Sequence, residues 1–341
     1  MTVRARDNAG MSLGEFELIE SFFWRRPGQG PRRAVVGNGD DCAVIAPAPG
    51  MQLAVSTDTM VEGRHFLSTV DPARLGHKAL AVNLSDLAAC GAQPLAFTLA
   101  LTLPRVDEAW LSALARGLLD LADEHECELI GGDTTAGPLS IGIMVMGEVP
   151  PGQALLRSGA QPGDDLWVSG HPGEARLALE AFRGTLHPGL SGEAFEATRL
   201  AMEAPDPRVA LGLGLRGVAT AAIDISDGLL GDLGHILRRS RVGATVALDA
   251  LPVSPWLASR SVAEQQDCIL AGGDDYELLF TAPAAQRPAV AALADSLGLL
   301  LSRIGRIEAD PGLRVRSTGL DEVQAGPLVP NRWVSFDHFR G

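Results

Sequence analysis

Apolar residues recur along the chain at two spacings, and these spacings predict a mixture of helices and strands. Helical spacing covers residues 73–89, 108–126 and 229–237, with the apolar positions on one face of each segment. Apolar runs at 53–56, 95–103 and 139–149 are typical of strands instead, and a further helix is expected at 205–216. We therefore expect a protein built from both helices and sheets.

A cluster of turn-forming residues separates two such regions. Pro150, Pro151 and Gly152 follow the apolar run at 139–149, and the segment DLWVSG then begins a second region. The length of 341 residues is enough for two domains, each with its own core. We predict domains at residues 1–150 and 151–341.

Six apolar stretches run into small-residue turns that carry aspartate. Two carboxylates about 4 Å apart repel by roughly 4 kcal/mol at an effective dielectric near 20. If these side chains meet, they need bound cations or shifted protonation. Oxygen ligands suit Mg²⁺, and protein Mg²⁺ sites usually also hold substrate phosphates. The motifs therefore predict nucleotide chemistry, and they lie at 35–41, 53–59, 80–86, 129–135, 221–227 and 270–277.

Each motif taken singly also has a structural interpretation. Asp, Ser, Thr and Gly form turns and helix caps, and Asp227 stands just before the predicted helix at 229–237. The combination of six motifs, adjacent hydroxyls and glycines favours a functional role, because glycines let backbone N–H groups approach phosphate.

Charge and composition narrow the choice of partner and compartment. The formal charge of −14 argues against nucleic acid or an anionic membrane as a partner. The four cysteines are widely spaced, without the pairs expected of a zinc site or a disulfide framework. The N-terminus has no apolar signal region, and no uninterrupted run approaches 18 apolar residues. We expect a cytoplasmic protein.

Nucleotide binding through a Walker-A loop is excluded. The chain contains 27 arginines and a single lysine, Lys78, and no Gly-Lys pair occurs anywhere. The segment GLGLRG at 212–217 matches the dinucleotide fingerprint by letters only, since it follows a helical pattern and precedes a strand.

The order of motifs resembles the bacterial thiamine-monophosphate kinase family. The matching segments run from GEFELI at 14–19 to FDHF at 336–339, and so cover nearly the whole chain. They are GDDCAV, STDT, KALAVNLSDLAA, GGDTT, AIDISDGL, DLGHI and the DYEL segment. The family is part of a superfamily with aminoimidazole-ribonucleotide synthetase and selenophosphate synthetase, whose members bind ATP without a Walker loop.

The resemblance implies an activity and a set of site residues. The γ-phosphoryl group of ATP would be transferred to thiamine monophosphate, which gives thiamine diphosphate, and Mg²⁺ ions would neutralise the phosphates. The implied metal ligands are Asp41, Ser56, Thr57, Asp58, Asp86, Asp133, Asp224 and Asp227. The implied ATP contacts are Gly132, Asp133, Arg157 and Ser226. The implied substrate contacts are His65, Asp274 and Phe336.

The resemblance also implies the architecture and the assembly. The fold would be α+β with two domains: an N-terminal mixed-sheet domain, whose sheet pairs with that of a second subunit in a homodimer, and a C-terminal α/β layered domain. At residue 274 the family commonly has Glu, so Asp274 has a shorter reach. No general base is expected, because a phosphate monoester is already anionic near neutral pH.

Two alternatives remain open. One is a sister ATP-dependent synthetase that acts on another acceptor. The selenophosphate branch is disfavoured because the first 41 residues contain neither Cys nor Lys. The other alternative is a non-catalytic nucleotide- or metal-binding module, which the presence of every motif aspartate disfavours.

Overall fold

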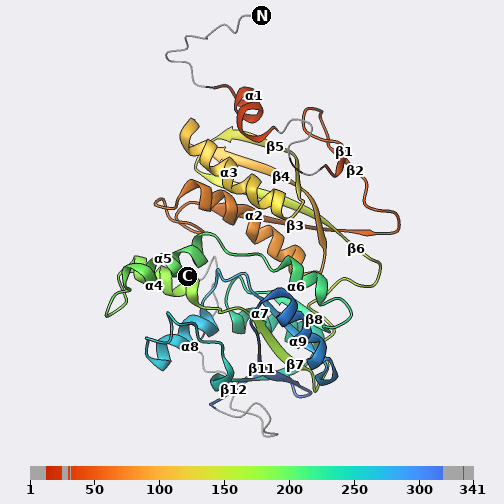
Figure 1. Cartoon of the computed structure of the whole chain (residues 1–341), viewed down its shortest axis with the longest axis vertical. Coiled ribbons are helices and arrows are strands. Elements are labelled where there is room, and N and C mark those ends of the chain that lie inside the picture. The colour runs from red at the N-terminus through yellow and green to blue at the C-terminus, as the bar shows by residue number, and fades with distance from the viewer. Residues whose placement is uncertain (1–12, 25–29, 31, 318–332, 334–341) are drawn as a thin grey trace, which may run out of the picture.

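The structure is a computed structural model, and it describes residues 13–24, 30, 32–317 and 333. Within these ranges the chain forms two large sheets, one above the other in the view of Figure 1. All strands of the first sheet lie before residue 150, and all strands of the second lie after residue 164. The exact boundary between domains stays a prediction. Phe336 lies outside the described residues.

The first sheet has four strands in the order β3-β6-β4-β5. Its strands are β3 (Gln52–Val61), β4 (Gln93–Leu103), β5 (Glu128–Ala136) and β6 (Ser140–Val149). Strand β4 pairs in parallel with β5 and antiparallel with β6, and β6 pairs antiparallel with β3. The sheet is mixed, as the sequence predicts.

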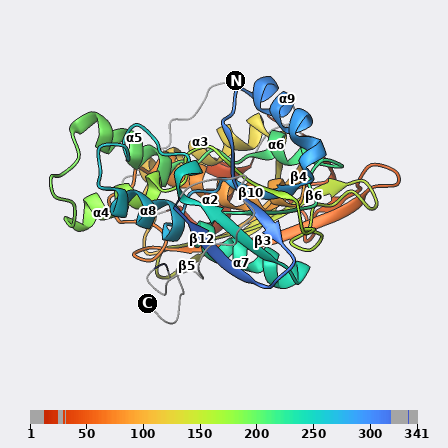
Figure 2. The same ribbon diagram turned by 90° about the horizontal axis from the view of Figure 1, so that it is seen from below.

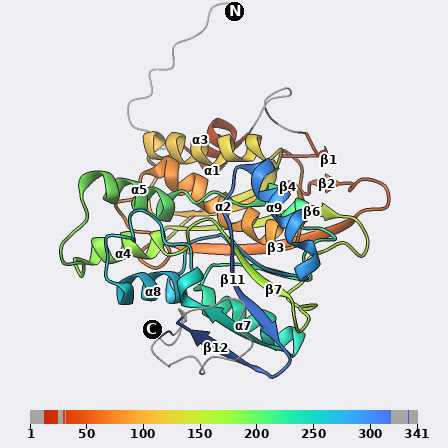
Figure 3. The same cartoon turned by 60° about the horizontal axis from the view of Figure 1, so that its bottom comes forward.

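Two helices, α2 (Pro72–Ala89) and α3 (Glu108–Glu124), cover one face of this sheet, as Figure 3 shows. The side chains of Asp71 and Asp107 accept hydrogen bonds from the first backbone N–H groups of the two helices. The helices cross closely at two glycines. A Cβ atom on Gly76 would lie 2.0 Å from the Leu114 carbonyl oxygen, and one on Gly117 would lie 1.8 Å from that of Ala73.

The second sheet has six strands in the order β12-β9-β11-β7-β10-β8. Only the β12–β9 pair is parallel, and the other neighbours run antiparallel. Its strands are β7 (Asp165–Ser169), β8 (Ala221–Asp224), β9 (Gly243–Ala247), β10 (Leu278–Ala282), β11 (Leu301–Glu308) and β12 (Gly312–Arg316).

Helices surround the second sheet, with α4, α5 and α8 together at one side of the molecule (Figure 2). The helices of this region are α4 (Glu174–Arg183), α5 (Gly192–Glu203), α6 (Val209–Gly214), α7 (Leu229–Ser240), α8 (Val262–Ala271) and α9 (Arg287–Leu297). The N-terminal region adds α1 (Glu15–Leu18), a π-helical turn at Ile19–Phe23 and a hairpin of β1 (Ala34–Val36) and β2 (Val44–Ile45).

One buried apolar cluster joins the two parts of the chain. It extends from the first sheet through α2 to α6, β10 and α9. A Cβ atom on Gly212 of α6 would lie 2.0 Å from the Ala88 carbonyl oxygen of α2, so these helices also cross closely. Helix α2 is therefore packed on both sides and is a rigid support for the side chains that it presents.

Most predicted elements are confirmed, and the errors have local causes. The helix expected at 73–89 runs from Pro72 to Ala89. The helix expected at 205–216 covers only Val209–Gly214, because residues 205–208, which include two prolines, form no regular secondary structure. The strand expected at 53–56 runs on to Val61. Among the described residues, no helix is long and apolar enough to span a membrane.

Candidate active site

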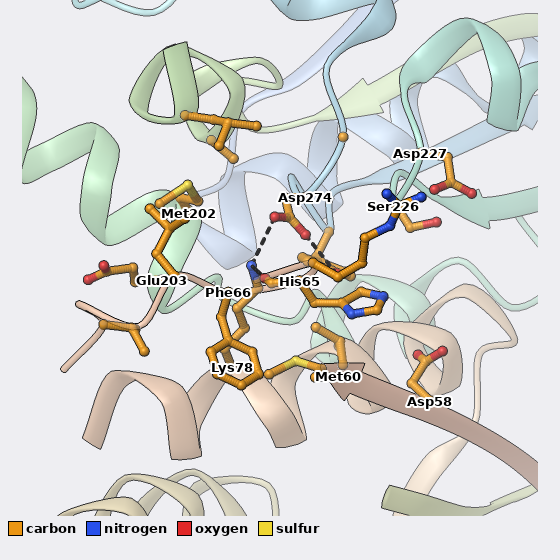
Figure 4. A pocket seen from close by; sticks show the side chains of 18 of the residues that line it. Asp58, Met60, His65, Phe66, Lys78, Met202, Glu203, Ser226, Asp227 and Asp274 are labelled. Atoms are coloured by element: carbon orange, nitrogen blue, oxygen red, sulfur yellow. Dashed lines mark hydrogen bonds and ion pairs between the residues drawn. The ribbon is translucent and has the colours of Figure 1, made fainter. Parts of the chain in front are cut away.

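A cavity of about 1320 Å³ lies where α2, the end of β3, the loop after β8 and helices α4 and α5 come together. Figure 4 shows that Asp58 and Asp227 lie towards one side of it and Met202 and Glu203 towards the other. The cavity thus has an acidic end and an end lined largely by apolar side chains and arginines. Nine predicted site residues line it: Ser56, Asp58, His65, Asp86, Arg157, Asp224, Ser226, Asp227 and Asp274.

Strand β3 supplies Ser56 and Asp58 from the face that α2 covers. Residues two apart on a strand point to the same face, and both side chains line the cavity. The Ser56 hydroxyl donates to the carboxylate of Asp86 on α2. The backbone N–H of Asp58 donates to Asn83 Oδ1 at 3.1 Å. Helix α2 thus fixes the position of this strand.

Helix α2 also links the two parts of the acidic end. Ser85 is buried and donates from its hydroxyl to Asp224 Oδ2 at 2.8 Å. Asp224 is the last residue of β8 in the second sheet. Asp86 and Asp224 therefore approach the same space from different sheets.

The loop between β8 and α7 carries Ser226 and Asp227. The carboxylate of Asp232, one turn into α7, accepts hydrogen bonds from the backbone N–H groups of Ser226, Asp227 and Gly228 at 3.1–3.2 Å. These N–H groups are the kind that binds phosphate at a helix N-terminus. Here Asp232 occupies them, so the loop is held by the protein itself.

Burial and mutual repulsion raise the pKa values of the carboxylates at the acidic end. For Asp58 burial is the main cause, and the charges of Asp86 and Asp227 add to it, so that its pKa is about 6. Burial also raises the pKa of Asp86, while the Ser56 hydrogen bond and the charge of Arg157 act in the opposite direction. The pKa of Asp224 is raised by burial and then by Asp86.

These shifts test whether the implied Mg²⁺ ions fit. A raised pKa shows that the surroundings stabilise the ionised carboxylate poorly. A bound cation would stabilise that ionised form. The donor set of carboxylates and a hydroxyl suits Mg²⁺. Across the described residues, no three acidic, His or Cys side chains are close enough to form a complete ligand set by themselves. Such a site suits ions that also bind substrate phosphates and water.

A different group of residues surrounds His65 and Asp274. Lys78 Nζ contacts Asp274 Oδ2 at 2.9 Å (Figure 4). It also contacts the His65 carbonyl oxygen at 3.4 Å. The Tyr276 hydroxyl donates to Asp274 Oδ1 at 3.1 Å. Asp274 has φ +69°, and Asp is among the residues that tolerate this left-handed conformation.

Four predicted residues do not line the cavity: Asp41, Thr57, Gly132 and Asp133. Thr57 lies between Ser56 and Asp58 on β3, so its side chain points to the opposite face, where its hydroxyl donates to the Ile143 carbonyl at 3.0 Å. We call this the open face of the first sheet.

Asp133 also lies on the open face. The cross-strand row there is Asp133, Ala100, Gly142 and Thr59, and all except Gly142 are exposed. Gly132 has φ +153°, and a Cβ atom on it would lie 1.9 Å from the Leu99 carbonyl oxygen, so only glycine fits. Asp41, in the turn between β1 and β2, is exposed as well.

Several residues that shape the site were missed by sequence reasoning. Asn83 and Ser85 stand inside the NLSD motif, but their roles depend on which helix face each occupies. Asp232 had a usable signal, because an acidic residue a few positions into a helix can satisfy the N–H groups of the first turn. Tyr276 gave no signal beyond its place in the DYEL segment.

Comparison with known proteins follows the two parts of the fold. The family model described as AIR synthase related protein, N-terminal domain, matches residues 39–149, and the one for the C-terminal domain matches residues 161–318. The thiamine-monophosphate kinase of Escherichia coli O157:H7 is 45% identical over 331 residues, which are 96% of this chain and 99% of the relative. That of Caulobacter vibrioides is 37% identical and covers 83% of this chain and 81% of its own length.

Solved structures of thiamine-monophosphate kinases are also similar to this chain. Thiamine-monophosphate kinase from Stenotrophomonas maltophilia K279a has a TM-score of 0.79 at 50% identity, over 83% of this chain and 91% of that one. AaThiL complexed with AMPPCP and TMP has a TM-score of 0.70 at 28% identity, over 81% and 87%. The hydrogenase maturation protein HypE of E. coli shares the fold, with a TM-score of 0.68 at 21% identity over 92% and 96%.

The two family-model matches, one for each part of the fold, identify an AIR synthase-related protein. Within that superfamily, the chain belongs to the thiamine-monophosphate kinase family.

Proposed function

We propose that the protein transfers the γ-phosphoryl group of ATP to the phosphate of thiamine monophosphate, with thiamine diphosphate and ADP as products. One observation carries the proposal: four aspartates, Asp58, Asp86, Asp224 and Asp227, face one end of a cavity whose other parts contain His65 and Asp274. The solved structure of AaThiL is of a complex with AMPPCP, an ATP analogue, and TMP.

The acidic end would hold the phosphates through Mg²⁺. Asp58, Asp86 and Asp224, with the Ser56 hydroxyl, would be ligands from the cavity side, and Asp227 would hold a further ion. Mg²⁺ would supply charge neutralisation and alignment of the phosphoryl groups. Arg157 and Ser226 line the same end, and the planar Arg157 guanidinium suits phosphate oxygens.

The chain itself would align the acceptor. The phosphate of thiamine monophosphate is an anionic nucleophile near neutral pH, so no residue needs to remove a proton from it. His65 and Asp274 would orient the thiamine end, with the apolar side chains of Phe66 and Met202 near the ring.

The remaining predicted ligands require a second subunit in this proposal. Strands β3 and β5 are separated by three strand spacings, about 14 Å at roughly 4.8 Å each, and Asp58 and Asp133 point to opposite faces. Since Mg²⁺ binds oxygens at about 2.1 Å, one ion cannot reach both residues of one chain. A homodimer that pairs the open faces and sets the edge strand β5 of one chain beside the edge strand β3 of the other would bring Asp133 of one chain towards Thr57 and Asp58 of the other.

Exposed apolar side chains support this dimer. Leu53, Val55 and Val61 of β3 and Met144 of β6 are 40–60% exposed on the open face. Val55 is paired with Met146, and Thr57 with Met144, so these side chains form a continuous surface. An exposed apolar surface of this kind is typical of a protein interface.

The activity is tested by incubation with ATP, Mg²⁺ and one acceptor at a time. We expect equal amounts of ADP and thiamine diphosphate with thiamine monophosphate, and no phosphorylated product with unphosphorylated thiamine. ADP formation only with another acceptor would favour a sister synthetase. Binding of ATP and thiamine monophosphate without turnover would favour a non-catalytic module.

A further inference from the structure

Lys78 is the only lysine in the chain, and it lies buried beside the cavity, with 2% of its surface exposed. Its ammonium group contacts the carboxylate of Asp274 and the carbonyl oxygen of His65. These are the two described residues that are predicted to bind the acceptor, and they come from different parts of the fold. One cation thus connects both (Figure 4).

The ion pair is asymmetric. The side chain of Lys78 is 3% exposed, whereas that of Asp274 is 35% exposed. Lys78 therefore stands behind the carboxylate, and Asp274 is the partner that a bound molecule can touch. Removal of one partner from a buried ion pair leaves an uncompensated charge and a carboxylate without a fixed orientation. The Tyr276 hydroxyl, on the other carboxylate oxygen, would then be its only described side-chain partner.

Lys78 also shares a helix face with a ligand of the acidic end. Lys78, Val82 and Asp86 stand at intervals of four residues on α2, and all three line the cavity. At 1.5 Å per residue, Lys78 and Asp86 lie about 12 Å apart along the helix axis. Because α2 is packed on both sides, this spacing is fixed by the fold.

We propose that Lys78 is a positioning residue for the acceptor: it holds Asp274 and the His65 backbone at a fixed distance from Asp86, and so selects an acceptor with a phosphate at one end and a ring at the other. The proposal rests on the proposed function, which the turnover of the wild-type protein tests separately. Lys78 acts through Asp274 and takes no part in the chemistry.

The first test is kinetic and uses Lys78→Met, which keeps the length of the side chain without its charge. We expect kcat/KM for thiamine monophosphate to fall at least 10-fold, while the KM for ATP changes less than 3-fold. The double variant Lys78→Met/Asp274→Asn should lose clearly less than the product of the two single losses, since Lys78 acts largely through that carboxylate. Arg287→Met is the matched control, because it removes an ion pair with Asp165 in the second sheet and should leave both constants unchanged.

The second test does not depend on the folding of a variant. Incorporation of ¹³Cε-lysine gives a single side-chain methylene signal, from Lys78. Thiamine monophosphate should shift this signal, and AMPPCP with Mg²⁺ alone should not. The proposal is wrong if kcat/KM changes less than 3-fold or rises in Lys78→Met, if the two substitutions are additive, or if the signal does not respond to thiamine monophosphate. A wild-type protein without turnover of thiamine monophosphate would instead contradict the proposed function.

Discussion

The two faces of the first sheet carry different halves of the predicted site. On the covered face, Ser56 and Asp58 point to α2 and the cavity, and they contact groups on that helix. On the open face, Thr57 and Asp133 stand among exposed apolar side chains. Ser56, Thr57 and Asp58 are consecutive in sequence. Because side chains alternate along a strand, Ser56 and Asp58 lie on the covered face and Thr57 lies on the open face. One sequence motif can therefore serve the cavity of its own chain and an interface at once.

The largest effect is expected at the acidic end of the cavity, where Asp224 of the second sheet meets the covered face of the first. Asp224→Asn keeps the size of the side chain and can keep the Ser85 hydrogen bond, but it removes a charge from the acidic end. We expect kcat to fall about 10³-fold, the upper end of the range found when an electrostatic contact is removed from a reacting group, with circular dichroism unchanged. Steady-state kinetics at several Mg²⁺ concentrations measure this. Turnover within 10-fold of wild type would show that Asp224 is not part of the acidic site.

A charge on the open face should have the next largest effect. Val55 is 60% exposed there, and Val55→Asp would bury an unpaired carboxylate if two open faces pair, at a cost of several kcal/mol. We expect dissociation to monomers at micromolar concentration, measured by sedimentation, and loss of about 100-fold in turnover. Val253→Asp, at an exposed valine elsewhere, is the control. A Val55→Asp protein with the wild-type sedimentation coefficient would contradict this role of the open face.

The loop between β8 and α7 lines the same cavity as the covered face, and a change there should have a smaller effect. Asp232→Ala leaves the N–H groups of Ser226, Asp227 and Gly228 without their acceptor, each a loss of about 1 kcal/mol or more. We expect kcat/KM for ATP to fall about 10-fold and the melting temperature to fall by a few degrees. Asp232→Asn, which keeps an acceptor oxygen, should lose less of both. Equal losses in the two variants would show that the hydrogen bonds do not hold the loop.

The pH dependence of stability should show the smallest effect. The pKa of Asp58 in the folded protein is raised by burial to about 6 from its usual value of 3.8, so the folded state binds more protons between these values. Stability without Mg²⁺ should therefore fall as pH rises from about 4 through 6. Asp58→Asn should weaken this trend in melting temperatures measured in EDTA. The same pH dependence of the melting temperature in both proteins would contradict a raised pKa at Asp58.

The sequence predicts the helices of the site well and its strands less well. Helix α2 is found within one residue, because its apolar spacing is long and regular, and Asp86 therefore falls on the correct element. The strand at 53–56 was expected to end before Thr57 and Asp58. It continues to Val61, and only this length reveals that the two side chains point in opposite directions.

Other parts of the fold lacked a usable pattern. Strand β9 is five residues long and completely buried, so it has no polar alternation to identify it. Helix α8 was missed although its capping box of Ser261 and Glu264 is visible in the sequence. The contacts of Lys78 with Asp274 and His65 join positions far apart in the chain, and no local rule predicts them.

Mixed dimers of two inactive variants test the central claim, that the two faces complete one site across two chains. Asp58→Asn damages the covered face, and Asp133→Asn damages the open face, and each alone should be inactive. When the two proteins are co-expressed and assort at random, half of the dimers are mixed. We predict about one quarter of wild-type activity, because one of the two sites in each mixed dimer then has neither substitution. Activity no higher than that of the separate variants would show that Asp58 and Asp133 serve within one chain, and would contradict the account.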